Sequence, residues 1–318
     1  MKKLLFLINP ISGVGRGTSL ASRIASGLQG RLPQSDYDII FTTADVTGQA
    51  RELAPRYETI VAAGGDGTLS RVARGLVDQA ARTRLGIIPL GTGNDCARSL
   101  GVLPVWKQGG LSALLDLMLA GATRPVDMFT FGTRSMFINY AGLGRDAAVA
   151  AMFDRLRSRT WVRPLCDRGG SKLLYALIAL ACSRTRCAPG IELSWCTPEG
   201  ATETIRFSHP ACQLVICNID SYGGGVRFSS TTRMDDGLFE IAVMRGSARW
   251  LLLHLGRLTG RAYDRVLPPG AVIRAREMRL YTGRSSFAQI DGETVAVAPD
   301  ETLEVRPAAR LRMLAASP

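Results

Sequence analysis

The 318-residue chain has few histidines, no paired cysteine motif and no long apolar run. Its seven cysteines are an odd number without any Cys-x-x-Cys spacing, so neither a disulfide framework nor a zinc site is predicted, and a reducing cytosol fits best. The two histidines, His209 and His254, have no ligand-like spacing, which disfavours histidine-based hydrolase chemistry.

The apolar runs are too short for membrane insertion. Residues 4–8 follow two lysines and resemble a secretion signal, but a signal needs about 7 to 15 apolar residues and Asn9-Pro10 ends this run. The longest run elsewhere, residues 173–182, is well below the roughly 18 to 20 residues that span a bilayer. We therefore predict no transmembrane segment and interpret residues 4–8 as part of a strand.

The chain does have an excess of positive charge, with 39 basic and 27 acidic residues. A net charge of +12 indicates an anionic partner: a nucleotide, a phospholipid surface or nucleic acid. The excess is uneven, because residues 127–186 contain ten basic and four acidic residues. Hydrophobic residues at 46% and charged residues at 21% exclude a disordered, collagenous or coiled-coil protein.

The first 125 residues alternate between predicted strands and helices. Strands separated by helices imply right-handed βαβ units, so we predict a Rossmann-like parallel sheet with helices on both faces. The predicted strands are 3–8, 37–41, 59–63 and 85–88, and the predicted helices are 18–29, 47–56, 67–80 and 108–121.

After Pro125 the pattern becomes rich in strands, which predicts a mainly antiparallel β-sandwich. The domains are predicted as an α/β domain over 1–125, to which residues 307–318 return, and a β-rich domain over 126–306. The predicted strands are 126–131, 135–140, 191–195, 204–207, 213–218, 239–244, 271–281, 287–290 and 302–306, and the predicted helices are 146–159, 172–182 and 248–260.

Glycine-rich turns follow three strands of the first domain, where an open α/β sheet places its ligand crevice. The first turn, residues 9–17, contains Gly-x-Gly-x-Gly, which fits a plain tight turn as well as a phosphate-binding loop. The second, Gly-Gly-Asp-Gly-Thr at 64–68, and the third, Pro-Leu-Gly-Thr-Gly-Asn-Asp at 89–95, each carry an aspartate near a predicted helix start. Asp66 would repel a bare phosphate, so we interpret it as organising Mg²⁺, with a helix cap as the alternative. Because no lysine-bearing Walker loop is present, the predicted nucleotide site relies on backbone amides and Mg²⁺.

These loops and later motifs resemble the diacylglycerol kinase catalytic-domain family of lipid kinases, whose fold is related to that of NAD kinases and phosphofructokinases. The later motifs are Asn139-Tyr140, residues 144–147, residues 218–225, residues 235–238 and Asp291-Gly292-Glu293. The chain departs from the family pattern at Ser70 and Arg71, where an Asn-Glu pair is common, and at Cys96, where an aromatic residue is common.

The resemblance implies site residues at the matched positions. It implies a structural Mg²⁺ loop in which Asp236 supplies its side chain and Arg233 and Leu238 supply carbonyls. It also implies that Asp66, Asp291 and Glu293 are catalytic, Glu293 being the usual proton acceptor. The residues implied for ATP are Asn9, Pro10, Ser12, Gly13, Thr42 or Thr43, Gly64, Gly65, Asp66, Gly67, Thr68, Leu69, Ser70, Thr92, Asn94 and Asp95.

The spacing of Asp291 and Glu293 also indicates a role without reference to the family. Two carboxylates two residues apart at a strand end lie on the same side, and Gly292 permits a turn between them. A carboxylate within reach of a hydroxyl suffices as the base in phosphoryl transfer, whereas a surface turn with solvated acids is the alternative. Which of the two acids is the base stays open.

A basic segment at residues 145–186 contains nine basic and three acidic residues around Trp161, Tyr175 and the apolar run. Such a segment indicates contact with anionic phospholipids, the alternatives being a core helix with a solvated face or an oligomer contact such as a homodimer. We expect a cytoplasmic enzyme peripherally associated with the inner face of the membrane.

The expected activity is an ATP- and Mg²⁺-dependent kinase that converts diacylglycerol to phosphatidic acid. Other acceptors left open are phosphatidylglycerol, ceramide and sphingoid bases, and a NAD kinase is the alternative with a soluble substrate. A non-catalytic nucleotide or nucleic-acid binder is disfavoured, because the basic residues form no nucleic-acid-reading motif, so no nucleic-acid partner is expected.

Overall fold

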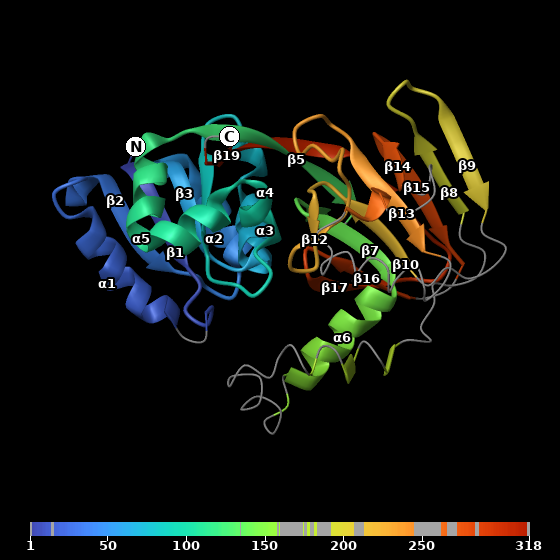
Figure 1. Ribbon diagram of the computed structural model, residues 1–318, viewed down its shortest axis with the longest axis horizontal. Coiled ribbons are helices and arrows are strands. Elements are labelled where there is room, and N and C mark those ends of the chain that lie inside the picture. Colours follow the sequence, from blue (N-terminus) through green and yellow to red (C-terminus); the bar gives the residue numbers. More distant parts are fainter. Residues whose placement is uncertain are drawn as a thin grey trace.

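The computed structural model of the chain has two sheet-based domains that lie side by side (Figure 1). The residues that the structure describes are 2–13, 16–133, 135–157, 159, 174, 177–178, 181–182, 192–206, 213–244, 262–265, 272–283 and 286–316.

A seven-stranded sheet forms the first domain, in the order β2-β1-β3-β4-β19-β5-β6. The strands from β2 to β19 are parallel, and β5 and β6 are antiparallel to their neighbours. The bounds are β1 (Lys2–Ile8), β2 (Tyr37–Phe41), β3 (Tyr57–Gly64), β4 (Arg84–Pro89), β5 (Thr123–Phe131), β6 (Ser135–Phe137) and β19 (Pro307–Leu314).

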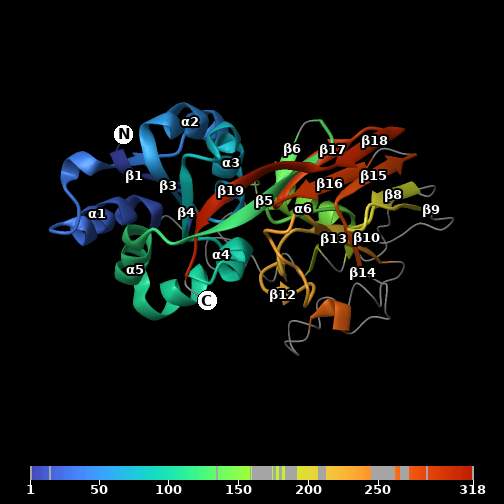
Figure 2. The same ribbon diagram turned by 90° about the horizontal axis from the view of Figure 1, so that it is seen from above.

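Helices cover both faces of this sheet, with α1 (Arg16–Leu28) and α5 (Val102–Ala120) on one side and α2 (Val46–Leu53) and α3 (Asp66–Gly75) on the other (Figure 2). The four predicted strands are confirmed to within two residues at each end. Helix α5 begins at Val102, before the predicted start at residue 108. Gly110, at φ 61° and ψ −149°, interrupts the helix, and the prediction covers mainly the part that follows this break. The short helix α4 (Asp95–Ser99) precedes it.

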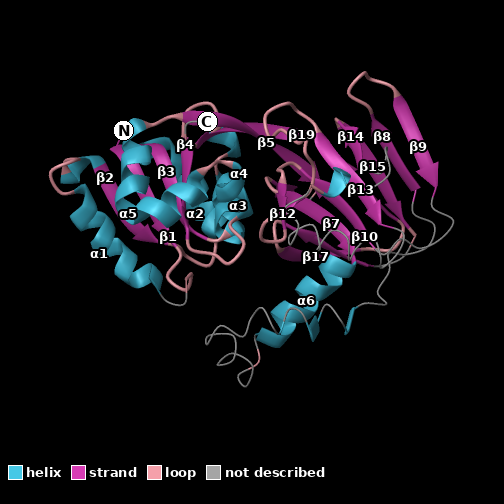
Figure 3. Ribbon diagram, in the orientation of Figure 1, coloured by secondary structure: helices cyan, strands magenta, loops and turns pink. Residues whose placement is uncertain are grey.

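Antiparallel sheets form the second domain, as predicted (Figure 3). A six-stranded sheet, β14-β13-β10-β7-β16-β17, packs on a four-stranded sheet, β18-β15-β8-β9, through a shared core that includes Trp195 of β8 and Ile216 of β10. The bounds are β7 (Tyr140–Gly144), β8 (Glu192–Cys196), β9 (Thr202–Arg206), β10 (Gln213–Cys217), β11 (Ser221–Tyr222), β12 (Val226–Arg227), β13 (Phe239–Met244), β14 (Val272–Ala275), β15 (Glu277–Thr282), β16 (Ser286–Ile290), β17 (Glu293–Val297) and β18 (Glu301–Val305).

Some predicted elements of the second domain differ from the observed ones. The predicted strand 135–140 is divided into β6 and β7, which belong to different sheets, and the predicted strand 271–281 is divided at Arg276. Strand β17 was not predicted. Helix α6 (Arg145–Arg157) extends away from the sandwich (Figure 1). The predicted helix 248–260, and most of 172–182, lie outside the described residues.

Strands β5 and β19 run from one domain into the other (Figure 2). Within β5, Val126 and Met128 lie in the core of the first domain, whereas Phe129 and Phe131 lie in the core of the sandwich. Pro125 is inside this strand, paired with Arg312 of β19. The two domains are therefore joined by an antiparallel ribbon whose register shifts once, between Pro307 and Ala309.

Candidate functional site

The three glycine-rich loops meet at the carboxyl ends of β1, β3 and β4. Asn9 donates its backbone N–H to the Ala63 carbonyl at 2.9 Å and its side-chain amide to Thr68 Oγ1 at 3.0 Å. A Cβ on Gly91 would lie 2.6 Å from Gly65 Cα, so the second and third loops touch through backbone atoms that only glycine leaves accessible. The loops thus form one surface with exposed backbone, as phosphate binding requires.

Thr42 and Thr43 follow β2 at the edge of this surface. The Thr42 amide donates to the Ile8 carbonyl at 2.9 Å, which continues the pairing of β1 and β2. The Thr43 hydroxyl donates to the Asp45 carbonyl at 3.1 Å, whereas the Thr42 hydroxyl makes no hydrogen bond within the described part of the chain. Thr42 is therefore the better placed of the two for a ligand.

Asp66 is the first residue of α3, but it does not cap that helix, because Gly65 is the N-cap and provides no side-chain hydrogen bond. Its Oδ1 instead accepts the Cys96 N–H of α4 at 3.3 Å. Burial, and next the charge of Asp95, raise the pKa of Asp66 to about 6. The helix-cap interpretation of Asp66 is therefore wrong, and the carboxylate has acceptor capacity to spare.

Asp95 is buried and held by the second domain. Ser221 Oγ donates to its Oδ1 at 2.5 Å, and the Gly224 amide donates to its Oδ2 at 2.8 Å. One helical turn later, Ser99 Oγ donates to Asp220 Oδ1 at 2.5 Å. The motif at 218–225 therefore fastens α4 and the third loop to the sandwich.

Asp291 is also buried, in the turn between β16 and β17, and it accepts four hydrogen bonds. Three come from the backbone amides of Ile138, Asn139 and Tyr140 at 2.9 to 3.0 Å, and one comes from Ser70 Oγ at 2.6 Å. Burial raises the pKa of Asp291 even though these donors favour the charged form. A carboxylate whose oxygens are this fully occupied builds the site and is not available as a base.

Glu293 is the more accessible acid, with 26% of its side chain exposed. It pairs with Arg71 Nε and, at 2.9 Å, with Arg74 Nη2, both on α3 of the first domain. The structure thus brings Asp66, Asp291 and Glu293 to the same helix, one at its start and two along its side.

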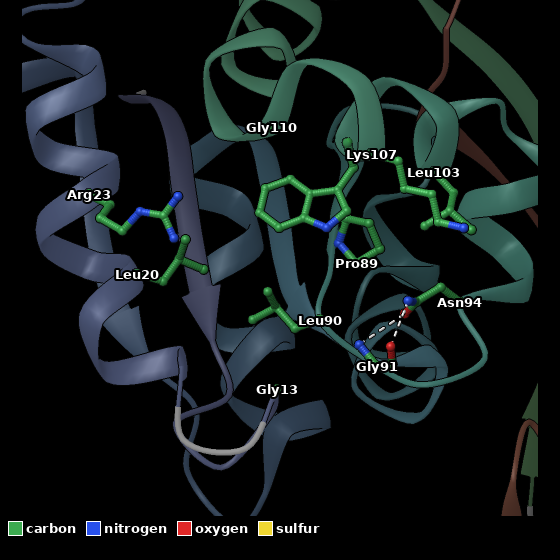
Figure 4. Close-up of a pocket in the computed structure, with 11 residues that line it drawn as sticks. Gly13, Leu20, Arg23, Pro89, Leu90, Gly91, Asn94, Leu103, Lys107 and Gly110 are labelled. Atoms are coloured by element: carbon green, nitrogen blue, oxygen red, sulfur yellow. Dashed lines mark hydrogen bonds between the residues drawn. The ribbon is translucent and has the colours of Figure 1, made fainter. Parts of the chain in front are cut away.

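A cavity of about 460 Å³ lies beside the first and third loops, between α1 and α5 (Figure 4). Arg23 directs its guanidinium from α1 into this space, and Asn94 holds Gly91 with two hydrogen bonds, of 3.0 and 2.7 Å. The described residues that line it include two cationic side chains and no carboxylate, which suits an anion. The lining residues are Gly13, Leu20, Arg23, Pro89, Leu90, Gly91, Asn94, Leu103, Trp106, Lys107 and Gly110.

The loop at 233–238, predicted to hold Mg²⁺, is closed by hydrogen bonds within the loop and by Arg274 of β14. Asp236 accepts the Leu238 amide at 3.1 Å and pairs with Arg274 Nη2 at 2.5 Å, and Arg233 pairs with Asp235 at 3.2 Å. A metal ion at Asp236 would have to displace Arg274, so the loop in this arrangement does not fit Mg²⁺. Within the described ranges, no three His, Cys, Asp or Glu side chains are grouped as a metal site would need.

Comparison with known proteins agrees with these motifs. The profile of the diacylglycerol kinase catalytic domain matches residues 3–131, and that of the diacylglycerol kinase accessory domain matches residues 136–294. The diacylglycerol kinase of Staphylococcus epidermidis is 34% identical over 297 residues, which cover 92% of this chain and 86% of that protein. The chain belongs to the diacylglycerol kinase family of lipid kinases.

Other members of the diacylglycerol kinase family match over shorter regions. The diacylglycerol kinase of Bacillus subtilis is 35% identical over 150 residues, 46% of each chain. The "Probable lipid kinase YegS-like" of Klebsiella pneumoniae is 29% identical over 190 residues, 59% of this chain and 57% of that one. A diacylglycerol kinase crystal structure from Bacillus anthracis aligns with a TM-score of 0.66 at 18% identity, covering 99% of this chain and 97% of that one, which shows a shared fold.

A phosphate-bound Mg²⁺ of a diacylglycerol kinase fits better at Asp66 than in the loop 233–238. A Cβ on Gly93 would lie 3.0 Å from Asp66 Oδ2 and 3.5 Å from Asp95 Oδ2, so two carboxylate oxygens border one small space. Burial and the charge of Asp95 raise the pKa of Asp66, and a hard cation beside its carboxylate would offset both. Asp66 is thus the residue that would hold the ion.

The sequence reasoning missed the partners of this family's acidic residues. Arg71 was noted only as a departure from the pattern, and Arg74 was not noted, although their spacing places both on one face of α3. The dipeptide Asp291-Gly292 is a hairpin signal, since both residues have positive φ and Ile290 pairs with Glu293. Interpreted as a hairpin turn, this dipeptide predicts β17.

Proposed function

We propose that this member of the diacylglycerol kinase family transfers the γ-phosphate of Mg²⁺-bound ATP to the hydroxyl of diacylglycerol, which gives phosphatidic acid. The observation that carries the proposal is that the glycine loops contact one another and that α3, which begins in one of them, pairs with the accessible Glu293 of the other domain. The S. epidermidis relative, which matches over most of both chains, is named a diacylglycerol kinase. The names of the YegS-like relatives specify no acceptor.

In the proposed mechanism the first domain binds the nucleotide and the second presents the acceptor. Gly13 and the loop at 64–68 donate backbone amides to the phosphates, and the start of α3 adds its dipole. Glu293 accepts the proton of the lipid hydroxyl as its oxygen bonds to the γ-phosphorus, while the bond from that phosphorus to the bridging oxygen breaks and ADP leaves. Mg²⁺, when bound near Asp66, supplies charge neutralisation on the phosphates.

Transfer of labelled γ-phosphate to lipids in mixed micelles tests the proposal. The panel contains diacylglycerol, phosphatidylglycerol, ceramide and a sphingoid base, with NAD as the soluble acceptor. Labelled phosphatidic acid, lost when Mg²⁺ is chelated, is the expected product. Label in another lipid would show that this lipid, and not diacylglycerol, is the acceptor. Label in NADP would show a soluble acceptor, and the absence of any labelled product would contradict the proposal.

We further propose that α6 and the rest of the basic segment 145–186 meet the membrane surface. Met152 on α6 is 43% exposed and Leu177 is 57% exposed, and Arg155 and Arg159 are exposed nearby. Arg145 is buried, so it takes no part in such a surface. Among the described residues, no helix combines the length and the apolar character that crossing a bilayer requires.

Vesicle binding tests this contact. Changing Arg155, Arg157 and Arg159 to Glu should weaken binding to anionic vesicles steeply, because each cation contributes about 1 kcal/mol at such a surface. The matched control changes Arg51, Arg56 and Arg82, exposed arginines of the first domain, to Glu. Vesicle binding that does not depend on salt concentration, or that weakens as much in the control variant, would contradict the proposed membrane contact.

A further inference from the structure

Helix α3 carries two arginines beside Glu293. Arg71 and Arg74 are three residues apart, so they share a face of the helix, and both donate to the Glu293 carboxylate. The same helix begins at Asp66 in the second glycine loop. One rigid element therefore connects the surface expected to hold phosphate with the acid expected to take the proton.

The two arginines have more positive charge and more donors than Glu293 uses. Two guanidinium groups face one carboxylate, which leaves a local excess of one positive charge. Arg74 Nε is buried and has no hydrogen-bond partner within the described part of the chain, while 47% of the Arg71 side chain is exposed. A further anion can therefore be accommodated.

The neighbouring acid Asp291 accepts no hydrogen bond from either arginine. Its oxygens are occupied by Ser70 and by three backbone amides of the second domain. Ser70 also accepts a hydrogen bond from Arg74 Nη2 at 3.1 Å, so Ser70 links the two acids without adding negative charge. The donor capacity that the arginines do not use therefore lies beside Glu293.

Phosphate is the anion that suits this place. Helical side chains lean toward the N-terminus of their helix, so Arg71 and Arg74 lean toward the glycine loop at residues 64–68. That loop contains no lysine, and guanidinium forks bind phosphate oxygens in pairs. Under the proposed function, which this step requires, the anion that reaches this end of α3 is the terminal phosphate of ATP.

We propose that Arg71 and Arg74 form a cation pair that Glu293 occupies when no nucleotide is bound and that the terminal phosphate of ATP takes over. A phosphate that carries more charge than a carboxylate competes for the guanidinium groups. Its arrival releases the Glu293 carboxylate toward the acceptor hydroxyl. The base is thus freed only when a transferable phosphate is present.

Calorimetric binding of Mg²⁺-ADP and of a non-hydrolysable Mg²⁺-ATP analogue, without lipid, tests the inference. The measured quantity is the Kd for ADP divided by the Kd for the analogue. In R71Q/R74Q this ratio should fall by about 10- to 100-fold, because charge-assisted hydrogen bonds to the terminal phosphate are lost, while ADP affinity stays within about twofold. In E293Q the ratio should rise, because the competing carboxylate is removed.

The matched control is R51Q/R56Q, which removes two exposed arginines that pair with Asp78 and Glu52 and should leave the ratio unchanged. An unchanged ratio in R71Q/R74Q, or a ratio in E293Q that stays level or falls, overturns the inference. E293Q retains both arginines, so it decides the matter even if the double variant does not fold. A wild-type protein that binds neither nucleotide would instead contradict the proposed function itself.

Discussion

The glycine loops and the β16–β17 turn each contain two acids, and the two acids differ in the same way in both regions. Asp95 and Asp291 are 1% and 2% exposed, and each accepts hydrogen bonds from the opposite domain. Asp66 accepts backbone amides of Cys96 and Asp95, from its own domain, and among the described residues Glu293 meets arginine side chains alone. In each region one acid joins the domains and the other keeps acceptor capacity for chemistry.

The number of donors on a carboxylate therefore separates the two roles better than its place in a motif. A buried carboxylate surrounded by fixed amides cannot approach a substrate without leaving those amides unsatisfied. An acid held by long side chains can change partners at little cost.

Glu293→Gln removes the available acid of the turn. We expect kcat to fall by about 10²- to 10⁴-fold, the usual contribution of a positioned base, with ADP affinity unchanged. The lipid kinase assay and calorimetry measure the two quantities. Turnover that survives in this variant would assign the base elsewhere.

Asp291→Asn removes the joining acid of the same turn. In place of one carboxylate oxygen, the asparagine would present N–H groups to a backbone N–H that this oxygen accepts in the wild type. The free energy of unfolding should therefore fall by about 2 to 5 kcal/mol. Denaturant unfolding measures the change, with the exposed Asp78→Asn as control. A variant as stable as the wild type would show that the four hydrogen bonds do not hold the turn.

Asp66→Asn tests the available acid of the loops and adds a pH dependence. The pKa of Asp66 is raised from its usual value near 3.8 to about 6, so its ionisation opposes folding above about pH 6, and this cost disappears below about pH 4. The variant should therefore be more stable than the wild type by up to about 3 kcal/mol at pH 7 and equally stable at pH 4.

The same substitution should weaken Mg²⁺-nucleotide binding, and in the wild type this binding should weaken as the pH falls through about 6. Unfolding curves at the two pH values and metal-dependent calorimetry check both results. If the variant were less stable than the wild type at pH 7, Asp66 would be an acid that stabilises the fold and not one that keeps acceptor capacity for a metal ion.

Ser70→Ala removes one donor to Asp291 and should have the smallest effect. The three backbone amides remain, so the expected loss of stability is about 1 kcal/mol, with little change in kcat. Thermal unfolding and the kinase assay measure it. A large fall in kcat would mean that the link from Ser70 to Arg74 positions Glu293 more strongly than the contrast implies.

Much of the fold was readable from the sequence, because hydrophobic periodicity is local. Buried runs such as residues 4–8 and 59–63 predicted the parallel strands to within two residues. The antiparallel character of the second domain was also predicted. The hairpin strand β17 was missed although Asp291-Gly292 signals it, and the break at Gly110 shortened the predicted α5.

The basic segment shows where reading charges from sequence fails. Arg145 was counted with the surface cations, but it begins α6 in a buried position. Charge counting treats every arginine as solvated, whereas burial depends on which elements pack over it. The same limit applies to Arg274, which closes the predicted metal loop from a strand 38 residues away along the chain.

By itself the sequence determined the two-domain α/β and β-sandwich architecture, the three glycine loops and the motifs of the diacylglycerol kinase family, because each depends on residues that are close in the chain. Only the tertiary structure decided which acids are saturated and which are available, and that Arg71 and Arg74 face Glu293. Those properties depend on donors that come from residues more than 100 positions away, and local patterns carry no information about such contacts.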